Sequence, residues 1–80
     1  MPVVFRFGPY RFFFYSNEGD PREPVHIHVR EGRNIAKFWL KPLVSMADSK
    51  GFDARALREI SAIIEHNAVL IERTWNDHFS

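Results

Sequence analysis

The segment Pro24-Val25-His26-Ile27-His28-Val29-Arg30 decides how the rest of the chain is arranged. In it, apolar residues alternate strictly with polar ones, and a β-strand gives its side chains this period of two. The two faces of the strand are Val25, Ile27 and Val29 on one side and His26, His28 and Arg30 on the other. Burying imidazoles and a guanidinium without partners is costly, so we expect the apolar face to lie against the core.

Three further segments are predicted to be strands of the same sheet. Residues 3–7, 10–16 and 34–40 are rich in aromatic and β-branched side chains, which favour strands. Gly8-Pro9 and Glu31-Gly32-Arg33 separate neighbouring strands, because glycine and proline suit the backbone angles of turns. The sequence therefore predicts a small antiparallel sheet of about four strands.

One long helix is predicted for residues 52–79. Asp53 is a good N-cap, and Phe52 before it can pack on Leu57 as a hydrophobic staple. Beyond the cap, apolar residues follow at steps of three or four: Leu57, Ile60, Ile64, Ala68, Ile71, Trp75 and Phe79. That spacing places them on one stripe of a helix. Asparagine is unfavourable inside a helix, so a break near Asn67 is the alternative to a continuous helix.

These elements predict an α+β fold in the order β-β-β-β-α, with the helix packed on one face of the sheet. The 80 residues are expected to form a single domain, 1–80. Residues 43–51 connect the sheet with the helix, and the sequence leaves open whether they form a short strand or a turn of helix. Because only one helix is available, the second face of the sheet is expected to be bare.

Composition narrows the classes of function. The chain has no cysteine, so neither a disulfide nor a thiolate metal site is available. Its net charge of +1 argues against a protein held to nucleic acid by overall charge, but leaves room for a local basic patch. No segment approaches the roughly 20 apolar residues of a membrane span, and the N-terminus lacks the features of a signal peptide. We therefore expect a soluble cytoplasmic protein.

The face that the helix leaves bare is the predicted functional surface. Arg11 and Lys37 are assigned to it because burying them would be costly, and the period of two brings their strand neighbours with them. This helix-free face consists of Arg11, Phe13, Tyr15, His26, His28, Arg30, Lys37 and Trp39. Rings that stack on bases, beside cations that contact phosphates, are typical of single-stranded RNA binding. The alternative is a second small core or a dimer or partner interface.

Four interpretations compete for His26 and His28. In one, a histidine is a general acid or base and Arg11, Arg30 or Lys37 stabilises a phosphate transition state, as in a metal-independent ribonuclease. In a second, the two imidazoles contact RNA or a protein without chemistry. In a third, they are structural and are satisfied by neighbouring side chains. The sequence does not decide between these, and whether the chain is an enzyme stays open.

The fourth interpretation is a site for zinc or another divalent metal. Two histidines at i and i+2 on a strand can chelate one ion, but such a site needs a third and usually a fourth ligand. The candidates for these positions are His66, His78, Asp20 and Glu23. Because the chain offers neither a thiolate nor an HExxH helix, we expect no cofactor and keep His26 and His28 as metal ligands only as an alternative.

Several segments together resemble a known family. They are Arg6-Phe7-Gly8, Pro24-Val25-His26-Ile27-His28-Val29, Ala36-Lys37-Phe38-Trp39-Leu40, and Gly51-Phe52 opening a helix that ends in Trp75 and Phe79. Over nearly the whole chain they are similar to a bacterial and phage family catalogued as domain of unknown function 4160. Its members are often encoded beside another small protein, in pairs that look like toxin–antitoxin operons. The resemblance implies a cytoplasmic bacterial protein with a protein partner encoded by an adjacent gene, and it implies no catalytic residues.

We therefore expect one half of a toxin–antitoxin-like gene pair that engages RNA or its protein partner through the helix-free face. One alternative is a non-catalytic interaction or dimerisation domain whose aromatic residues form a homodimer or partner interface. The other is a histidine-based metal-binding protein. No membrane partner is expected.

Overall fold

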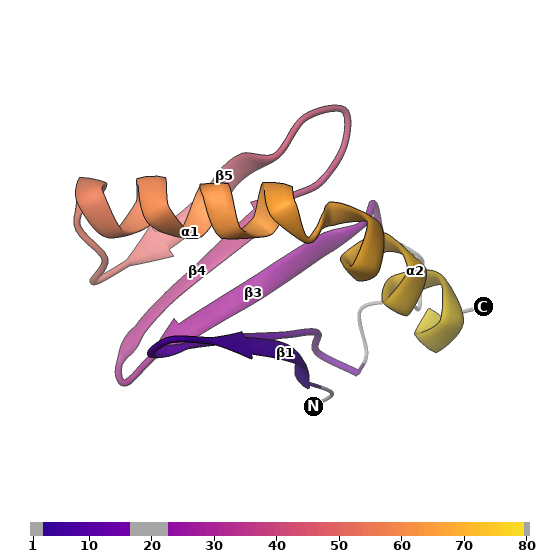
Figure 1. Ribbon diagram of the computed structural model, residues 1–80, viewed down its shortest axis with the longest axis horizontal. Helices are drawn as coiled ribbons and strands as arrows, with labels where there is room; N and C mark the ends of the chain where they lie inside the picture. Colours follow the sequence, from indigo (N-terminus) through magenta and orange to yellow (C-terminus); the bar gives the residue numbers. More distant parts are fainter. Residues whose placement is uncertain (1–2, 17–22, 80) are drawn as a thin grey trace.

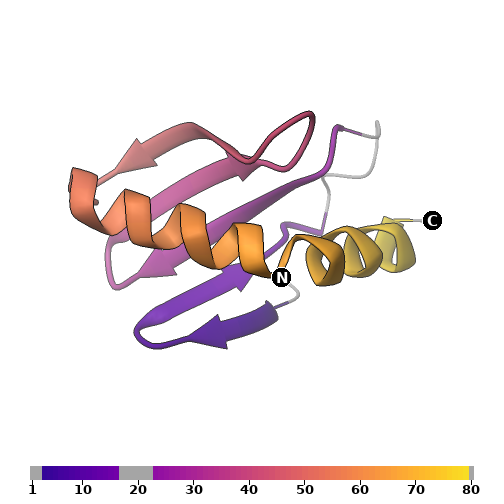
Figure 2. The ribbon, with the colours of Figure 1, turned by 45° about the horizontal axis from the view of Figure 1, so that its top comes forward.

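The fold is a single antiparallel sheet with helices on one of its faces, and the computed structural model describes residues 3–16 and 23–79 of it (Figure 1). The five strands lie side by side in chain order, β1-β2-β3-β4-β5. They are β1 (Val3–Phe7), β2 (Tyr10–Phe13), β3 (His26–Glu31), β4 (Asn34–Trp39) and β5 (Ser45–Lys50). The helices are α1 (Ala54–His66) and α2 (Ala68–Phe79). Figure 2 shows α1 lying across the strands and α2 continuing beyond one end of the sheet.

The α+β class is confirmed, but the sheet has five strands rather than about four, because residues 43–51, for which the sequence left a strand or a turn of helix open, contain a strand. Residues 45–50 form β5, which pairs with β4 along its length, for example Lys37 with Asp48. The segment Ser-Met-Ala-Asp-Ser-Lys shows neither alternation nor β-branched residues, so the usual strand signals are missing. As an edge strand with mostly exposed side chains, β5 is held chiefly by its backbone hydrogen bonds to β4.

The prediction of one long helix is also wrong, and the alternative break near Asn67 is what the structure contains. The Asn67 side-chain amide donates to the Ile63 carbonyl oxygen at 2.8 Å, which satisfies an acceptor at the end of α1. Its backbone carbonyl then accepts from the Ile71 N–H at 2.9 Å, in the first turn of α2. Asn67 therefore ends one helix and begins the next.

The start of α1 agrees with the sequence. Asp53 is the N-cap, and its Oδ1 accepts a hydrogen bond from the Ala56 N–H at 2.8 Å. Phe52 and Leu57 are both packed against the core, as a hydrophobic staple requires. Among the described residues, neither helix is long and apolar enough to cross a membrane.

The core lies between the helices and one face of the sheet. The predicted orientation of β3 is confirmed, because Ile27 and Val29 are buried against the helices. The other buried members of this core include Phe12, Phe14, Ala36, Phe38, Leu40, Ile60, Ile64, Ile71 and Trp75. Phe12 also stacks on Phe5 of β1, with ring centroids 4.4 Å apart. With β2, β3 and β4 turned this way, their alternate residues are fixed on the opposite face.

Candidate functional site

The strand register places the predicted surface residues on one face of the sheet. Residues directly opposite each other in an antiparallel pair project to the same side. The cross-strand partners are Arg11 and Arg30, Phe13 and His28, His28 and Lys37, and His26 and Trp39. Tyr15 follows β2 and joins them through its ring, whose centroid lies 4.5 Å from that of His28. All eight residues predicted for the helix-free face therefore come together.

Part of this face is buried, which corrects the expectation of an exposed aromatic platform. Phe13 and His26 have no exposed surface, and His28 is 8% exposed. His28 stacks on Phe13 with centroids 5.6 Å apart. His26 lies between two tryptophan rings, with centroid distances of 5.4 Å to Trp39 and 4.9 Å to Trp75. Rings from strands and helix thus form a second small core, the alternative that the sequence left open.

Trp75 explains how one helix residue reaches the helix-free face. It is buried in the main core, where its ring meets Phe14 edge-on at 5.1 Å and Phe79 at 4.4 Å. The same ring contacts His26, which projects from the opposite side of the sheet. Helix α2 continues past the end of the strands (Figure 2), and the contacts of Trp75 with Phe14 and His26 join rings from both faces of the sheet. A sequence pattern that assigns Trp75 to a single stripe cannot reveal this.

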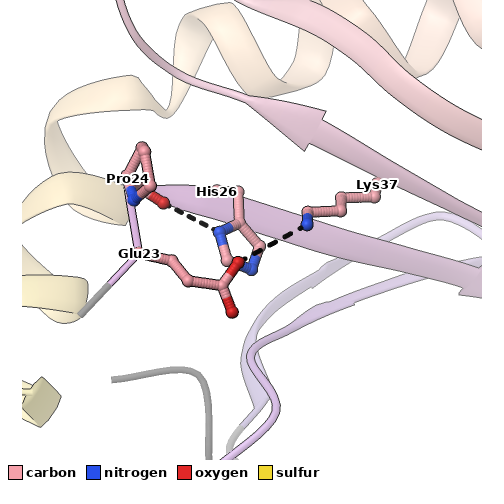
Figure 3. A network of polar contacts seen from close by, with 4 residues as sticks. All are labelled: Glu23, Pro24, His26 and Lys37. Carbon is pink, nitrogen blue, oxygen red and sulfur yellow. Dashed lines mark hydrogen bonds and ion pairs between the residues drawn. The ribbon is translucent and has the colours of Figure 1, made fainter. Parts of the chain in front are cut away.

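The His26 imidazole is fixed by a hydrogen bond as well as by packing (Figure 3). Its Nδ1 lies 2.8 Å from the Pro24 carbonyl oxygen, and since a carbonyl only accepts, Nδ1 is the donor. Beside it, Lys37 forms an ion pair with Glu23 at 3.8 Å, and the Lys37 ammonium sits 4.4 Å from the Trp39 ring centroid. Two residues immediately before β3 therefore hold this part of the face: Pro24 fixes the His26 ring, and Glu23 fixes the Lys37 ammonium.

The chemistry available to the two histidines differs. His26 is enclosed, so it cannot touch a substrate on the surface without rearrangement. His28 lines a cavity together with Tyr15 and Lys37, so it is the histidine that a bound molecule could reach. Acid–base catalysis by either residue stays a prediction.

The described part of the chain offers no third ligand for a metal ion bound by His26 and His28. There, no group of three or more histidine, cysteine, aspartate or glutamate side chains is arranged to hold an ion. Of the candidate ligands, Glu23 pairs with Lys37, His66 and His78 lie on the helices, and Asp20 lies outside the described residues. Metal binding by His26 and His28 is therefore still an untested alternative.

The basic part of the face is a row of cations that crosses the sheet. Arg6 of β1 lies opposite Arg11 of β2, and Arg11 lies opposite Arg30 of β3. Ile35 of β4 follows, and Lys50 of β5 lies opposite it. Three arginines thus stand in register on adjacent strands, and a lysine ends the row. We call these four cations the basic row.

No carboxylate neutralises the arginines of the basic row within residues 3–16 and 23–79. There, the ion pairs join Lys37 with Glu23 and Lys41 with Glu72. The Nε atoms of Arg11 and Arg30 are buried and make no hydrogen bond in the described structure. Like charges directly opposite each other in a sheet are destabilising, and a buried donor without an acceptor adds a further cost. The arrangement therefore lowers the stability of the free protein, and an anion bound beside the row would offset the repulsion.

A cavity of about 360 Å³ opens on this row. Arg6, Arg11 and Arg30 line it, with Gly8 and Gly32 from the two hairpin turns at its edge. Gly8 has φ of 55° and Gly32 of 60°, the left-handed region that glycine adopts without strain. These glycines permit the two tight turns that border the cavity. The first cavity is therefore lined by positive charge.

A second cavity of about 250 Å³ lies on the same face, over β3, β4 and β5. Its lining combines rings, an aliphatic residue and charges: Tyr15, His28, Ile35, Lys37, Asp48 and Lys50. Arg30 lines the first cavity and its cross-strand partner Ile35 lines the second, so the two cavities are neighbours.

Sequence reasoning missed Arg6 and Lys50. Arg6 was predictable, because a tight turn at Gly8-Pro9 places Phe7 opposite Tyr10 and therefore Arg6 opposite Arg11. Lys50 was not, because its segment carries no strand signal. Both residues extend the predicted cationic surface to the edges of the sheet.

The fold and this face define a small α+β protein whose single sheet carries helices on one side and a basic, aromatic-lined surface on the other. The family model described as a domain of unknown function, DUF4160, matches residues 10–76 of the 80 residues, and the chain belongs to this family. The match includes Arg11, Arg30 and Lys50 of the basic row. No curated protein and no solved structure matches the chain.

Proposed function

We propose that this protein binds single-stranded RNA across the helix-free face, with the phosphates on the basic row. The observation that carries the proposal is the register of Arg6, Arg11 and Arg30, which concentrates three guanidinium groups around one cavity. Guanidinium groups are well suited to bidentate contact with phosphate oxygens. A polyanion bound at the cavity would offset the repulsion within the row.

The distribution of charge supports this proposal although the total charge is small. The net charge is only +1, but the helices carry four carboxylates (Glu59, Glu65, Glu72 and Asp77) against three arginines (Arg55, Arg58 and Arg73), so their charges nearly cancel. The sheet face opposite them gathers the cations. The electrostatic attraction of an RNA strand is therefore stronger at the basic row than at the helices.

The shape of the face favours a single strand over a DNA duplex. The helix-free face is built from strands, and neither of the two helices in the described part of the chain projects from it to enter a major groove. Sheets that bind single-stranded RNA combine such a surface with rings that stack on bases, and here Tyr15 and His28 line the second cavity. A single strand can lay its phosphates along one row and turn its bases toward the rings.

The test is the salt dependence of RNA binding. A fluorescein-labelled single-stranded RNA of about ten nucleotides is titrated by fluorescence anisotropy from about 20 to 200 mM salt. Each lost phosphate contact is expected to reduce the slope of log K against log salt by roughly 0.7. The double variant Arg11→Gln/Arg30→Gln should bind about tenfold more weakly at low salt, with a slope smaller by roughly 1.4.

A matched control separates the basic row from net charge. Arg58→Gln/Arg73→Gln removes two exposed arginines from the helices and so changes the net charge equally. It should keep nearly the wild-type slope. If the control weakens binding as much as the sheet variant does, or if the wild type does not bind RNA at low salt, the proposal is wrong. Binding of duplex DNA as tight as that of single strands would also contradict it.

The second candidate is a protein partner, as expected for one half of a toxin–antitoxin-like pair. A specific observation favours it: β5 is an edge strand, with Met46 and the nearby Leu43 exposed, Leu43 to 75%. An exposed edge with apolar side chains is a surface on which another chain can add a strand. Co-expression with the product of an adjacent gene, followed by size-exclusion chromatography, tests this. A complex lost in Met46→Lys and retained in Arg11→Gln would place the partner at β5.

A further inference from the structure

We propose that the second cavity binds one guanine base of the RNA and that Asp48 selects it, an inference that rests on the proposed RNA binding. The cavity of about 250 Å³ is smaller than the roughly 300–1,000 Å³ of pockets for drug-sized ligands. A single heterocycle fits such a space. The cavity adjoins the basic row at the pair Arg30 and Ile35, so a strand with phosphates on the row can place a base in it.

The walls of the cavity suit an aromatic ring. Tyr15 is half-buried, and its ring meets His28 edge-on at 4.5 Å, which holds both rings in place. Ile35 adds an aliphatic side chain from β4. A planar base can therefore be sandwiched against apolar and aromatic surface, which is how unstacked RNA bases are commonly held.

Asp48 supplies a carboxylate that is available for hydrogen bonding at this cavity. It lies opposite Lys37 in the register, but the Lys37 ammonium is taken up by Glu23 and by the Trp39 ring. One oxygen of Asp48 accepts from the Ser49 N–H at 2.9 Å. A carboxylate offers about four acceptor sites, so this bond leaves acceptor capacity toward the cavity.

The donor pattern of the base decides which one such a carboxylate prefers. Guanine presents an N1–H and an exocyclic amino group side by side, so it can donate two hydrogen bonds to one carboxylate. Uracil presents a single N–H between two carbonyl oxygens, and these are repelled by a negative charge. Asp48 is exposed in the free protein, so a base that displaces water from its carboxylate without donating to it loses hydrogen bonds. The cavity is therefore assigned to guanine rather than uracil.

The experiment compares single-base changes in one RNA. Oligonucleotides of eight uridines are prepared with guanine, inosine, uracil or no base at the central position, and their affinities are measured by fluorescence anisotropy at one low salt concentration. Inosine keeps the N1–H and lacks the amino group. Wild type should bind the guanine oligonucleotide about tenfold more tightly than the uracil one, with inosine in between and the abasic strand no better than uracil.

Asp48→Asn is the decisive variant, and Glu65→Gln on the exposed surface of α1 is its charge-matched control. Both remove one negative charge, but only Asp48→Asn removes it from the cavity, so this variant should bind the all-uracil strand at least as tightly as Glu65→Gln does. Only Asp48→Asn should reduce the guanine-to-uracil ratio to about one. An unchanged ratio in Asp48→Asn, or no guanine preference in wild type, overturns the inference while RNA binding that depends on Arg11 and Arg30 stands. If no oligonucleotide binds, both proposals fall together.

Discussion

Arg11 and Arg30 lie directly opposite each other on β2 and β3, and Arg6 faces Arg11 from the other side. Arg11 is therefore the central cation of three, and no carboxylate of the described residues pairs with it. Such a placement lowers the stability of the free protein, because like charges across a strand pair repel. Residues that bind ligands often carry this cost.

The first prediction is that Arg11→Gln raises the stability of the free protein. Removing the central charge relieves two repulsive contacts, and we expect the free energy of unfolding to rise by about 0.5–1 kcal/mol in low salt. Urea denaturation measures it. The gain should shrink in high salt, because ions screen the repulsion in wild type. Arg58→Gln on α1 is the control and should change stability by less than about 0.5 kcal/mol. If Arg11→Gln is less stable than wild type, repulsion between Arg11 and its two neighbouring arginines does not lower the stability of the protein.

The sheet faces were predictable from the sequence because their signals are local. Val25, Ile27 and Val29 alternate with His26, His28 and Arg30, and the structure keeps every one of them on its assigned side. The orientations of β4 and β2, predicted from Lys37 and Arg11, are likewise those of the structure. A single charged residue on a strand is informative, because burying it on the core side costs more than most packing errors.

The burial of the face was not predictable in the same way. Phe13 packs against Tyr15 and His28, whereas His26 is covered because α2 begins a new direction at Asn67 and brings Trp75 against its ring. That geometry depends on where two helices meet, which local periodicity does not encode. Strand β5 was not predicted for a related reason: an edge strand with exposed polar residues needs no hydrophobic pattern.

The second prediction concerns Trp75, whose ring joins the two cores. Trp75→Leu should lower the free energy of unfolding by about 2–4 kcal/mol, because the smaller side chain leaves a cavity against Phe14 and withdraws from His26. Chemical denaturation followed by circular dichroism measures the loss. Val69→Ala, on the exposed surface of the same helix, should cost less than about 0.5 kcal/mol. Similar losses in the two variants would mean that Trp75 does not join the cores.

The third prediction tests the junction between β5 and α1. Gly51 has φ of 97°, and a Cβ there would collide with the Asn34 side chain. Gly51→Ala should therefore destabilise the protein by roughly 2 kcal/mol or more, through backbone strain and the displaced asparagine. Gly8→Ala is matched, because Gly8 also has positive φ, 55°, but open space around its Cβ position. It should cost only about 1 kcal/mol. Equal losses of stability in the two variants would show that the collision with Asn34 contributes nothing.

The last prediction is a pH dependence that arises at Tyr10. Its hydroxyl donates to Glu59 Oε1 at 2.7 Å, and this bond, with burial and the charge of Glu59, raises the pKa of Tyr10 from 10.0 to about 12. The folded protein holds this proton more tightly than the unfolded chain does. The resulting stability is complete below pH 10 and is lost as the pH rises through about 12. Because Glu59 is exposed, solvent screening limits the contribution to roughly 1 kcal/mol.

Tyr10→Phe isolates this contribution, because all other titrating groups are shared with wild type. At pH 8 the variant should be less stable by about 1 kcal/mol, since it lacks the hydrogen bond to Glu59. Between pH 10 and pH 12 the wild type should lose that advantage and the two denaturation curves should converge. Glu59→Gln provides the control, because a neutral acceptor returns the pKa of Tyr10 toward its ordinary value and moves the convergence to lower pH. A difference between wild type and Tyr10→Phe that stays constant up to pH 12 would show that the hydroxyl and Glu59 do not interact in solution.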